Sequence, residues 1–397
     1  MSGPTAVGIG WRPEIDLIVE RLPGVEFVEV IAEGIRPDRL PTSLRVLGAR
    51  GIPVIPHGVS LSLGGAQRPE PARLARLAAC AAAVHAPLVS EHVAYVRSGG
   101  REAGHLLPVP RTRVALDVVV ENVRIAQDTL EVPLALEHIA AVLAWPDDEL
   151  TEAQFLAEIA DRTGALVLLD VANLFSSQVN FGADPLAALD VLPLERIAYV
   201  HVAGGALRDG IWHDTHTDPI PEPVLALLAE LAGRVALPAV MLERDGDYPS
   251  ASALAGELAA IRSAVGRGPA GTDAISPRLG ALSRQPVNPE PRVPTGIRHG
   301  LADAQARLAD ALVGLAEPPP NFDGERVGVA RSVLVRKRSR AVARHAPAVA
   351  AALGERLGAL FAGYARAQPK PPGDADADVA GFVSHLRAAG RWRGRSR

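Results

Sequence analysis

Short apolar runs alternate with Ala- and Leu-rich stretches along the first 265 residues of the chain. Several of these runs are apolar without interruption, which is typical of parallel strands that are buried on both faces. We therefore predict eight strands, at residues 6–10, 27–31, 53–57, 88–93, 132–137, 166–170, 197–202 and 239–243.

The stretches between these runs have the spacing of amphipathic helices. The clearest of them are residues 73–85, 113–130, 149–163, 185–192 and 221–232. Eight strands that alternate with helices over about 260 residues are the pattern of a (β/α)8 TIM barrel, which is an α/β fold. In that fold the active site forms at the carboxyl ends of the strands.

Polar side chains stand where the predicted strands end. These positions, together with the segment after residue 202, hold His57, His92, Glu137, Asp170, Asn173, His201, Asp214, His216 and Glu243. Such residue types are rarely buried unless they are paired or bind a metal ion. Gathered at one rim of a barrel, they predict a site for more than one metal ion.

The types of ligand narrow the choice of metal. Imidazole and carboxylate groups without a thiolate suit iron, manganese, zinc or cobalt, and they do not favour copper(I) or an iron–sulfur cluster. One ion would need only three or four of these groups, so the surplus favours a multinuclear centre. Taken singly, each residue has an ordinary structural alternative: Asp170 or Asp214 could cap a helix, and Asn173 could be a turn residue.

Four further polar residues lie near these candidates. His138 and His213 stand beside stronger candidates, and we interpret them as residues that support the site from outside or face the surface. The Gly-rich residues 98–104 are predicted to form a mobile loop over the barrel mouth. His105 follows this loop and could touch substrate, and Arg208 could bind an acidic substrate group. Catalytic groups beyond the metal ligands stay unassigned.

The composition changes at residue 266. Residues 266–300 are rich in Pro, Gly and Arg and are predicted to be a linker, which separates a barrel domain (residues 1–265) from a helical, basic C-terminal domain (residues 301–397). Residues 301–397 hold 16 Lys+Arg against 9 Asp+Glu, whereas the first 300 residues hold 25 against 36. This asymmetry suggests two modules with different roles. The expected C-terminal helices cover residues 301–316, 327–343, 348–367 and 376–389.

Composition excludes several classes of protein. Cys80 is the only cysteine among 397 residues, so neither a disulfide framework nor a cysteine-based metal site can form. We find no signal peptide and no apolar run long enough to span a bilayer, which predicts a cytoplasmic protein without a membrane partner. Nucleic acid is not an expected partner, because the barrel is acidic. We interpret the basic run at residues 335–340 as a solvated helix face.

Several short motifs match one known family in their order along the chain. They are Pro56-His-Gly-Val-Ser-Leu-Ser-Leu-Gly-Gly65, Val89-Ser-Glu-His-Val93, Leu106-Leu-Pro-Val-Pro110, Leu169-Asp-Val-Ala-Asn173, Asn180-Phe-Gly182, His201-Val-Ala-Gly204, Asp214-Thr-His216 and Leu242-Glu-Arg-Asp245. Together they resemble the multinuclear non-haem iron oxygenase family that includes the methanobactin and thiaglutamate biosynthesis enzymes (MbnB/TglH-like). The resemblance covers residues 5–260.

The resemblance implies a TIM-barrel enzyme with two or three irons that uses dioxygen to oxidise a cysteine of a ribosomally synthesised peptide, in natural-product maturation. It implies that the nine strand-end candidates above are the iron ligands. The implied partner is a Cys-containing precursor peptide, together with a companion protein that presents it. The C-terminal domain could supply part of the companion's role; the alternative is a basic appendage that packs on the barrel.

The chain departs from the family pattern at three positions. His138 replaces an asparagine of a Glu-Asn motif, Ala172 replaces an asparagine between Asp170 and Asn173, and Gly205 replaces a histidine. These changes leave the main ligand set intact. Two other functions stay open. One is another TIM-barrel metalloenzyme, either sugar isomerase-like or zinc phosphodiesterase-like. The other is a non-catalytic scaffold that binds a peptide or partner.

Overall fold

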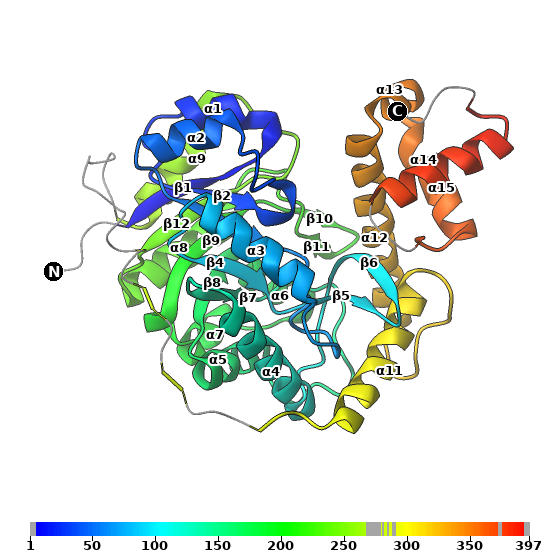
Figure 1. The fold of residues 1–397 in the computed structure, drawn as a ribbon, viewed down its shortest axis with the longest axis horizontal. Coiled ribbons are helices and arrows are strands. Elements are labelled where there is room, and N and C mark those ends of the chain that lie inside the picture. The colour runs from blue at the N-terminus through cyan, green and yellow to red at the C-terminus, as the bar shows by residue number, and fades with distance from the viewer. Residues whose placement is uncertain are drawn as a thin grey trace.

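Eight parallel strands close into a barrel in this computed structural model, which describes residues 5–266, 279, 282–283, 286–287, 291–371 and 375–392 (Figure 1). The strands are β1 (Ala6–Trp11), β2 (Val28–Ile31), β3 (Val54–Gly58), β4 (Val89–His92), β7 (Leu134–Glu137), β8 (Leu166–Asp170), β9 (Ile197–Ala203) and β12 (Ala239–Glu243). Their order around the barrel is β1-β12-β9-β8-β7-β4-β3-β2, and β1 pairs with β2 to close it. The predicted TIM barrel is confirmed, and each predicted strand end lies within two residues of the observed one.

Helices cover the outside of the barrel. They are α1 (Asp16–Arg21), α2 (Thr42–Ala49), α3 (Pro71–Ala83), α4 (Arg113–Thr129), α5 (Glu152–Thr163), α6 (Val171–Phe181), α7 (Pro185–Val191), α8 (Glu222–Arg234) and α9 (Ala251–Ala264). Side-chain oxygens define several of their starts: Thr112 caps α4, Thr151 forms a capping box on α5, and Ser250 caps α9. The five predicted barrel helices are all present, and Cys80 is buried in α3.

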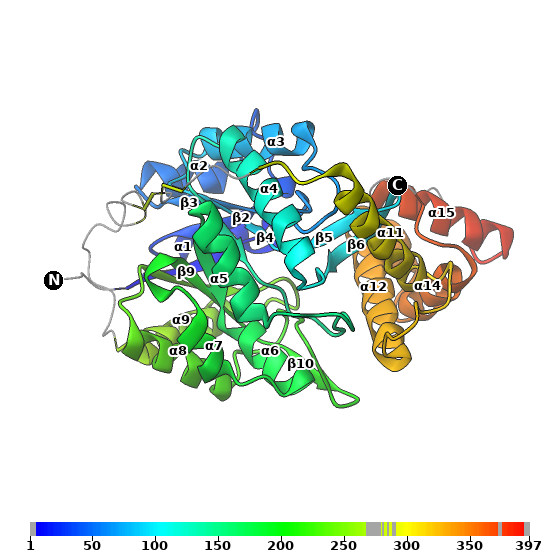
Figure 2. The ribbon, with the colours of Figure 1, turned by 90° about the horizontal axis from the view of Figure 1, so that it is seen from below.

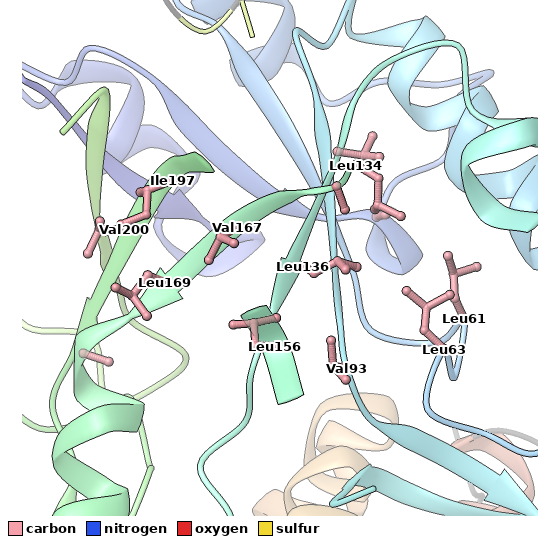
Figure 3. Close-up of a cluster of buried hydrophobic side chains, with 14 of the residues drawn as sticks. Leu61, Leu63, Val93, Leu134, Leu136, Leu156, Val167, Leu169, Ile197 and Val200 are labelled. Carbon is pink, nitrogen blue, oxygen red and sulfur yellow. The ribbon is translucent and has the colours of Figure 1, made fainter. Parts of the chain in front are cut away.

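The core is built almost entirely from aliphatic side chains. Figure 3 shows part of its outer layer, where Leu134, Leu136 and Val167 of adjacent strands lie near Leu156 of α5. A smaller cluster fills the barrel interior, with Phe27 edge-on to Tyr199 at a ring separation of 6.2 Å. This packing immobilises the strands, and therefore the side chains at their carboxyl ends.

Two hairpins extend from the carboxyl ends of the strands. One pairs β5 (Tyr95–Ser98) with β6 (Arg101–Leu107), and the other pairs β10 (Ala206–Arg208) with β11 (Ile211–His213). The prediction of a mobile loop at residues 98–104 is therefore wrong. Gly99 and Gly100 form the tip of the first hairpin with left-handed φ values of 57° and 74°, which glycine adopts readily. Ser98 Oγ donates to the carbonyl of Ala302 at 3.3 Å, so the C-terminal region holds the hairpin.

The C-terminal region is helical and packs against the barrel (Figures 1 and 2). Its described helices are α11 (Thr295–Leu312), α12 (Gly324–His345), α13 (Pro347–Leu353), α14 (Arg356–Ala367) and α15 (Ala375–Ala388). The single helix expected at residues 348–367 is two helices, because Gly354 breaks it with a φ of 52°. No helix in these described parts is long and apolar enough to cross a membrane.

Helix α11 begins at Thr295, inside the stretch whose composition predicts a linker. Two of its buried side chains bind the barrel backbone. Arg298 Nη1 donates to Ala66 O at 2.7 Å, and Gln305 Nε2 donates to Gly64 O at 2.8 Å. These buried hydrogen bonds attach the C-terminal helices to the loop after β3, beside the barrel mouth.

The basic run at residues 335–340 is a solvated helix face only in part, because Arg336 and Arg340 are exposed whereas Arg338 is buried. Arg338 is buried in a bidentate ion pair with Asp378 of α15, at 2.8 and 2.9 Å. Arg336, Lys337 and Arg340 lie on the side of α12 that lines a cavity at the barrel mouth. One charge of the run therefore forms an ion pair within the chain, and the other three line this cavity.

Candidate metal centre

The carboxyl ends of the barrel strands surround a cavity of about 380 Å³. Eight of the nine predicted ligands line it: His57, His92, Glu137, Asp170, Asn173, Asp214, His216 and Glu243. The ninth, His201, is fully buried and lies within 3.3 Å of both Glu137 and Glu243. The strand-end side chains that are far apart in sequence thus meet at one site.

Three overlapping groups of side chains have the spacing of metal ligands. The groups are His57–His92–Glu137, Glu137–Asp170–His201 and Asp170–His216–Glu243, and the ligand atoms within each group lie within 4.8 Å of one another. Glu137 belongs to the first two groups and Asp170 to the last two. Because each carboxylate carries two oxygens, these two residues can bridge neighbouring ions. Three adjacent metal positions are therefore compatible with this geometry.

The first group consists of two imidazoles that face one carboxylate. His57 Nε2 and His92 Nε2 lie 3.5 and 3.2 Å from Glu137 Oε2. Their other nitrogens point away: His57 Nδ1 contacts Ser90 Oγ at 2.8 Å, and His92 Nδ1 contacts Gly58 O at 3.2 Å. Such contacts orient an imidazole and leave its inner nitrogen free for a metal ion.

His201 is held in the same way by a residue that the sequence analysis missed. Its Nε2 lies 2.8 Å from Glu29 Oε2 of β2, while its Nδ1 faces Glu137 and Glu243. Glu29 also accepts a 2.7 Å hydrogen bond from Tyr199, whose hydroxyl contacts Ser90 at 2.6 Å. A continuous buried network therefore joins the histidines at 57 and 201. A lone Glu within the apolar run of β2 was the available signal for it.

Asp170 and Asn173 belong to the junction of β8 with α6. Asp170 Oδ1 accepts from the backbone N–H groups of Ala172 and Asn173 at 2.7 and 3.3 Å, so it caps α6 as well as facing the cavity. Asn173 Nδ2 donates to His138 O at 2.9 Å. Burial, together with the charges of Glu137 and Asp214, raises the pKa of Asp170 well above its usual range. A bound cation would offset this unfavourable charge.

The third group lies near β11 and β12. His216 Nε2 contacts Asp214 Oδ2 at 2.6 Å, and its Nδ1 lies 3.3 Å from Glu243 and 3.2 Å from Asp245. The backbone of His216 is left-handed, with a φ of 53°, and hydrogen bonds to Gly204 O and from Asp245 N hold it there. A non-glycine residue in this conformation is strained, and such strain is concentrated at functional sites.

Arg12 and Asp245 support Glu243 and were also missed from sequence. Arg12 Nε donates to Asp245 at 2.8 Å, and its Nη2 lies 3.3 Å from Glu243. Burial favours a neutral Glu243, but His216 and His201 outweigh it and hold the pKa of Glu243 well below its usual range. Asp245 follows Glu243 by two residues, so its position in the same strand-end segment was a usable signal.

The same competition between burial and opposite charge governs the first group. Burial lowers the pKa of His92, but Glu137 and Glu91 outweigh it and raise the pKa to about 9. Burial also disfavours a charged Glu137, yet His201 and His92 lower its pKa to about 2. In the metal-free protein, protons on His92 and His201 therefore balance the carboxylates.

Several inward atoms have no hydrogen-bond partner within the described chain. They are Glu137 Oε2, Asn173 Oδ1, His201 Nδ1 and Asp214 Oδ1. Buried polar atoms are rarely left in this way, because an unsatisfied group costs about 1–3 kcal/mol. All four are good ligand atoms, and three belong to charged or imidazole groups. The residues present therefore fit a centre of several divalent cations.

The remaining sequence candidates fall into two sets. His105 and Arg208 line the cavity, at positions where they can meet a substrate. His213 also lines it, 3.5 Å from Arg336 Nη2. His138 instead lines a separate small cavity beside α5, and only its backbone carbonyl contacts a predicted ligand, by accepting from Asn173. Its placement outside the centre agrees with the interpretation from sequence.

Gly205 lies under the second hairpin rather than in the centre. A Cβ atom at this position would lie 2.6 Å from both His213 O and Trp212 Nε1. The hairpin therefore leaves no space for a side chain here. The ligand groups described above are complete without residue 205.

The chain is similar to several known proteins. A family model described as RiPP precursor modification enzyme MbnB/TglH/ChrH matches residues 6–266. A second, described as SCO6045-like, C-terminal domain, matches residues 302–388. A UPF0276 protein of Streptomyces avermitilis is 46% identical and spans 98% of this chain and 89% of its own length. A UPF0276 protein of Caulobacter vibrioides is 40% identical and spans 66% of this chain and 95% of its own.

Two solved structures illustrate the distant similarity of this chain to other proteins. A sugar phosphate isomerase/epimerase of Parabacteroides distasonis aligns with a TM-score of 0.45 and 12% identity, over 66% of this chain and 95% of that one. Endonuclease IV of Thermus thermophilus aligns with a TM-score of 0.40 and 16% identity, over 66% of this chain and 99% of that one. At this level of identity neither match bears on function.

Proposed function

The chain belongs to the MbnB/TglH/ChrH family of RiPP precursor modification enzymes, and we propose that it oxidises a cysteine of a ribosomally synthesised precursor peptide at a centre of two or three irons. Dioxygen is the oxidant in this proposal. Membership of the family supports a peptide substrate, and the nature of the ligands supports iron.

One observation carries the proposal: the three ligand groups overlap through Glu137 and Asp170. A mononuclear site would need one such group. Glu137 and Asp170 would each be shared by two neighbouring ions, which would supply the redox chemistry when bound. Mixed imidazole and carboxylate ligands with open positions suit non-haem iron.

When bound, the irons would supply redox equivalents and a place for the thiolate and dioxygen to meet. The chain's own residues would hold and orient this centre. Glu29, Ser90 and Gly58 would fix the three inner histidines through their outward nitrogens. Arg12 would hold Glu243 and Asp245 in their charged forms. Six of the nine ligands lie at the ends of barrel strands, which would keep the positions of the reactants defined.

The cavity between the barrel and α12 is the proposed entry for the peptide. Its lining combines apolar residues such as Ile139 and Leu334 with the ligand side chains. A volume of about 380 Å³ can hold a few residues but not a folded domain. Because α12 forms one wall of this entry, we propose that the C-terminal helices help to present the peptide. A companion protein would otherwise have this role.

Co-expression with short Cys-containing reading frames beside the gene tests this function. Mass spectrometry of the peptide is expected to show an oxidative mass change that requires the intact enzyme. The matched control is the same peptide with serine in place of cysteine. A change that persists in Glu137→Gln, or that occurs equally in the serine peptide, would contradict the proposal.

A further inference from the structure

Helix α12 lies beside β6 at the edge of the barrel (Figure 2), and its residues line one side of the cavity above the metal centre. Ala330, Val333 and Leu334 contribute an apolar strip to this wall. Arg336 and Arg340 continue the same side of the helix by one and two further turns. The C-terminal region therefore brings cationic groups to a cavity whose floor is acidic.

Arg208 also lines the cavity, on β10 of the second hairpin. Arg336 of α12 reaches this hairpin, where its Nη2 lies 3.5 Å from His213 Nδ1. Burial and the charges of Arg208 and Arg340 lower the pKa of Arg336. Three like charges therefore gather at this side of the cavity.

The three arginines differ from Arg338 in their ion-pair partners. Among the described residues, none of Arg208, Arg336 and Arg340 forms an ion pair with a carboxylate. Asp209 acts on Arg336 electrostatically but is not within ion-pair distance. Arg338, on the same helix, shows the contrast, because Asp378 satisfies it fully. The cavity-facing arginines are available to a ligand.

Lys337 occupies the space between this cluster and the metal centre. Its Nζ lies 3.2 Å from His105 Nδ1, and burial lowers its pKa although Asp214 and Glu243 favour its charged form. Metal cations bound at those carboxylates would offset their negative charge. An anion in the outer part of the cavity would then meet the cationic side chains of α12 with less repulsion from the floor.

We propose that Arg208, Arg336 and Arg340 form a subsite for a carboxylate of the peptide substrate, next to the residue that enters the metal centre. This inference rests on the proposed function, in which a peptide occupies the cavity. A guanidinium group binds a carboxylate through two parallel hydrogen bonds, so a cluster of arginines selects both charge and orientation. The carboxylate comes either from an Asp or Glu side chain or from the carboxyl terminus of the peptide.

Calorimetric titration of the full chain with three short peptides tests the subsite. The probes are acetyl-Ser-Gly-Asp amide, acetyl-Ser-Gly-Asn amide and acetyl-Ser-Gly-Asn free acid. Serine replaces cysteine, so that binding does not depend on a thiolate reaching a metal ion. At least one acidic probe is expected to bind about tenfold more tightly than the neutral amide, as one charge-assisted contact would give. The acidic probe that binds more tightly identifies the source of the carboxylate.

The variant Arg336→Gln with Arg340→Gln is expected to lose this preference while binding of the neutral amide stays the same. Both side chains are exposed, so the fold should tolerate their loss. Replacement of both by lysine should retain part of the preference. The matched control is Arg307→Gln, an exposed arginine of α11 outside the cavity lining, which should behave as the unaltered chain.

Equal binding of all three probes, or no binding at millimolar concentration, would overturn the subsite. So would a preference that survives in the double glutamine variant. Tighter, arginine-dependent binding of a short oligothymidine would assign the cluster to nucleic acid instead. The purified protein could still prefer the acidic serine probes and yet contain no iron. This result would contradict the proposed chemistry but support the subsite.

Discussion

His201 Nε2 lies 2.8 Å from Glu29 Oε2, and both side chains are completely shielded from solvent. The two residues come from β9 and β2, which are separated in the barrel by β12 and β1. Each side chain therefore crosses the barrel interior to reach the other. This contact directs Nδ1 of His201 toward Glu137 and Glu243, where a metal ion would bind.

Replacement Glu29→Gln should weaken metal binding by about 10–100-fold, because an amide supports the imidazole less strongly than a carboxylate does. Competition with a chelator, read by metal analysis, measures this change. Tyr199→Phe is the comparison, since it removes the link to Ser90 but leaves the contact between Glu29 and His201. Its effect should be smaller. Unchanged affinity in Glu29→Gln would show that the contact does not tune the centre.

Glu137→Gln should remove more metal than His57→Ala. Glu137 belongs to two ligand groups, whereas His57 belongs to one. Metal ions per chain, counted by elemental analysis, should therefore fall by more than one ion in the first variant and by at most one in the second. Thermal unfolding checks that both variants remain folded. Equal losses would argue against a bridging role for Glu137.

The metal-free protein should lose stability as the pH rises from about 6.5 to 9. The folded pKa of His92, about 9, lies above its ordinary value of 6.5, so its contribution is complete below pH 6.5 and disappears as the pH passes the folded value. Glu137, with a pKa of about 2, contributes above its ordinary 4.5 and loses this contribution in acid. Maximum stability is therefore expected between these limits.

The melting temperature, measured as a function of pH, reports this loss of stability. It should fall by on the order of a few degrees between pH 6.5 and 9. His92→Gln should flatten the decline. Metal affinity should rise over the same range, because protons compete with the metal for the imidazoles. A metal-free protein that becomes more stable between pH 6.5 and 9 would contradict the charge balance described here.

Breaking the ion pair between Arg338 and Asp378 should destabilise the C-terminal helices and spare the barrel. The pair is bidentate and buried, and removal of one partner from such a pair costs about 3–5 kcal/mol. Hydrogen exchange of α14 and α15 should accelerate in Arg338→Met, and a second change, Asp378→Leu, should restore protection. His345→Gln is the control, because its contact with Asp376 joins the same two helices at the surface. Equal effects of the two single variants would refute the prediction.

The strands and most of the site could be predicted because two features of the sequence occur together. Apolar runs indicate the strands, and polar residues at the ends of these runs indicate the site. Most barrel strands are apolar runs with a polar residue at or near the rim where the fold places its chemistry, although Glu29 interrupts β2 and β4 is polar after Val89. His57, Glu137 and Glu243 are examples, each within the last two residues of its strand. The barrel closure needed no further information, since eight such runs with helices between them allow few other arrangements.

The supporting residues escaped prediction because their roles depend on closure of the barrel. Glu29 acts on His201, which follows it by 172 positions, and no local spacing connects them. The packing of α12 over the mouth is likewise a contact between distant segments. Its basic run has an ordinary amphipathic appearance, and only the tertiary structure separates buried Arg338 from the arginines that face the cavity.

The metal content of anaerobically purified protein tests the central claim most directly. Our account predicts two or three irons per chain, with an absorption change on exposure to oxygen. Zinc alone, with no response to oxygen, would contradict it and favour another class of metalloenzyme. A folded protein with almost no metal would contradict it equally and favour a binding scaffold.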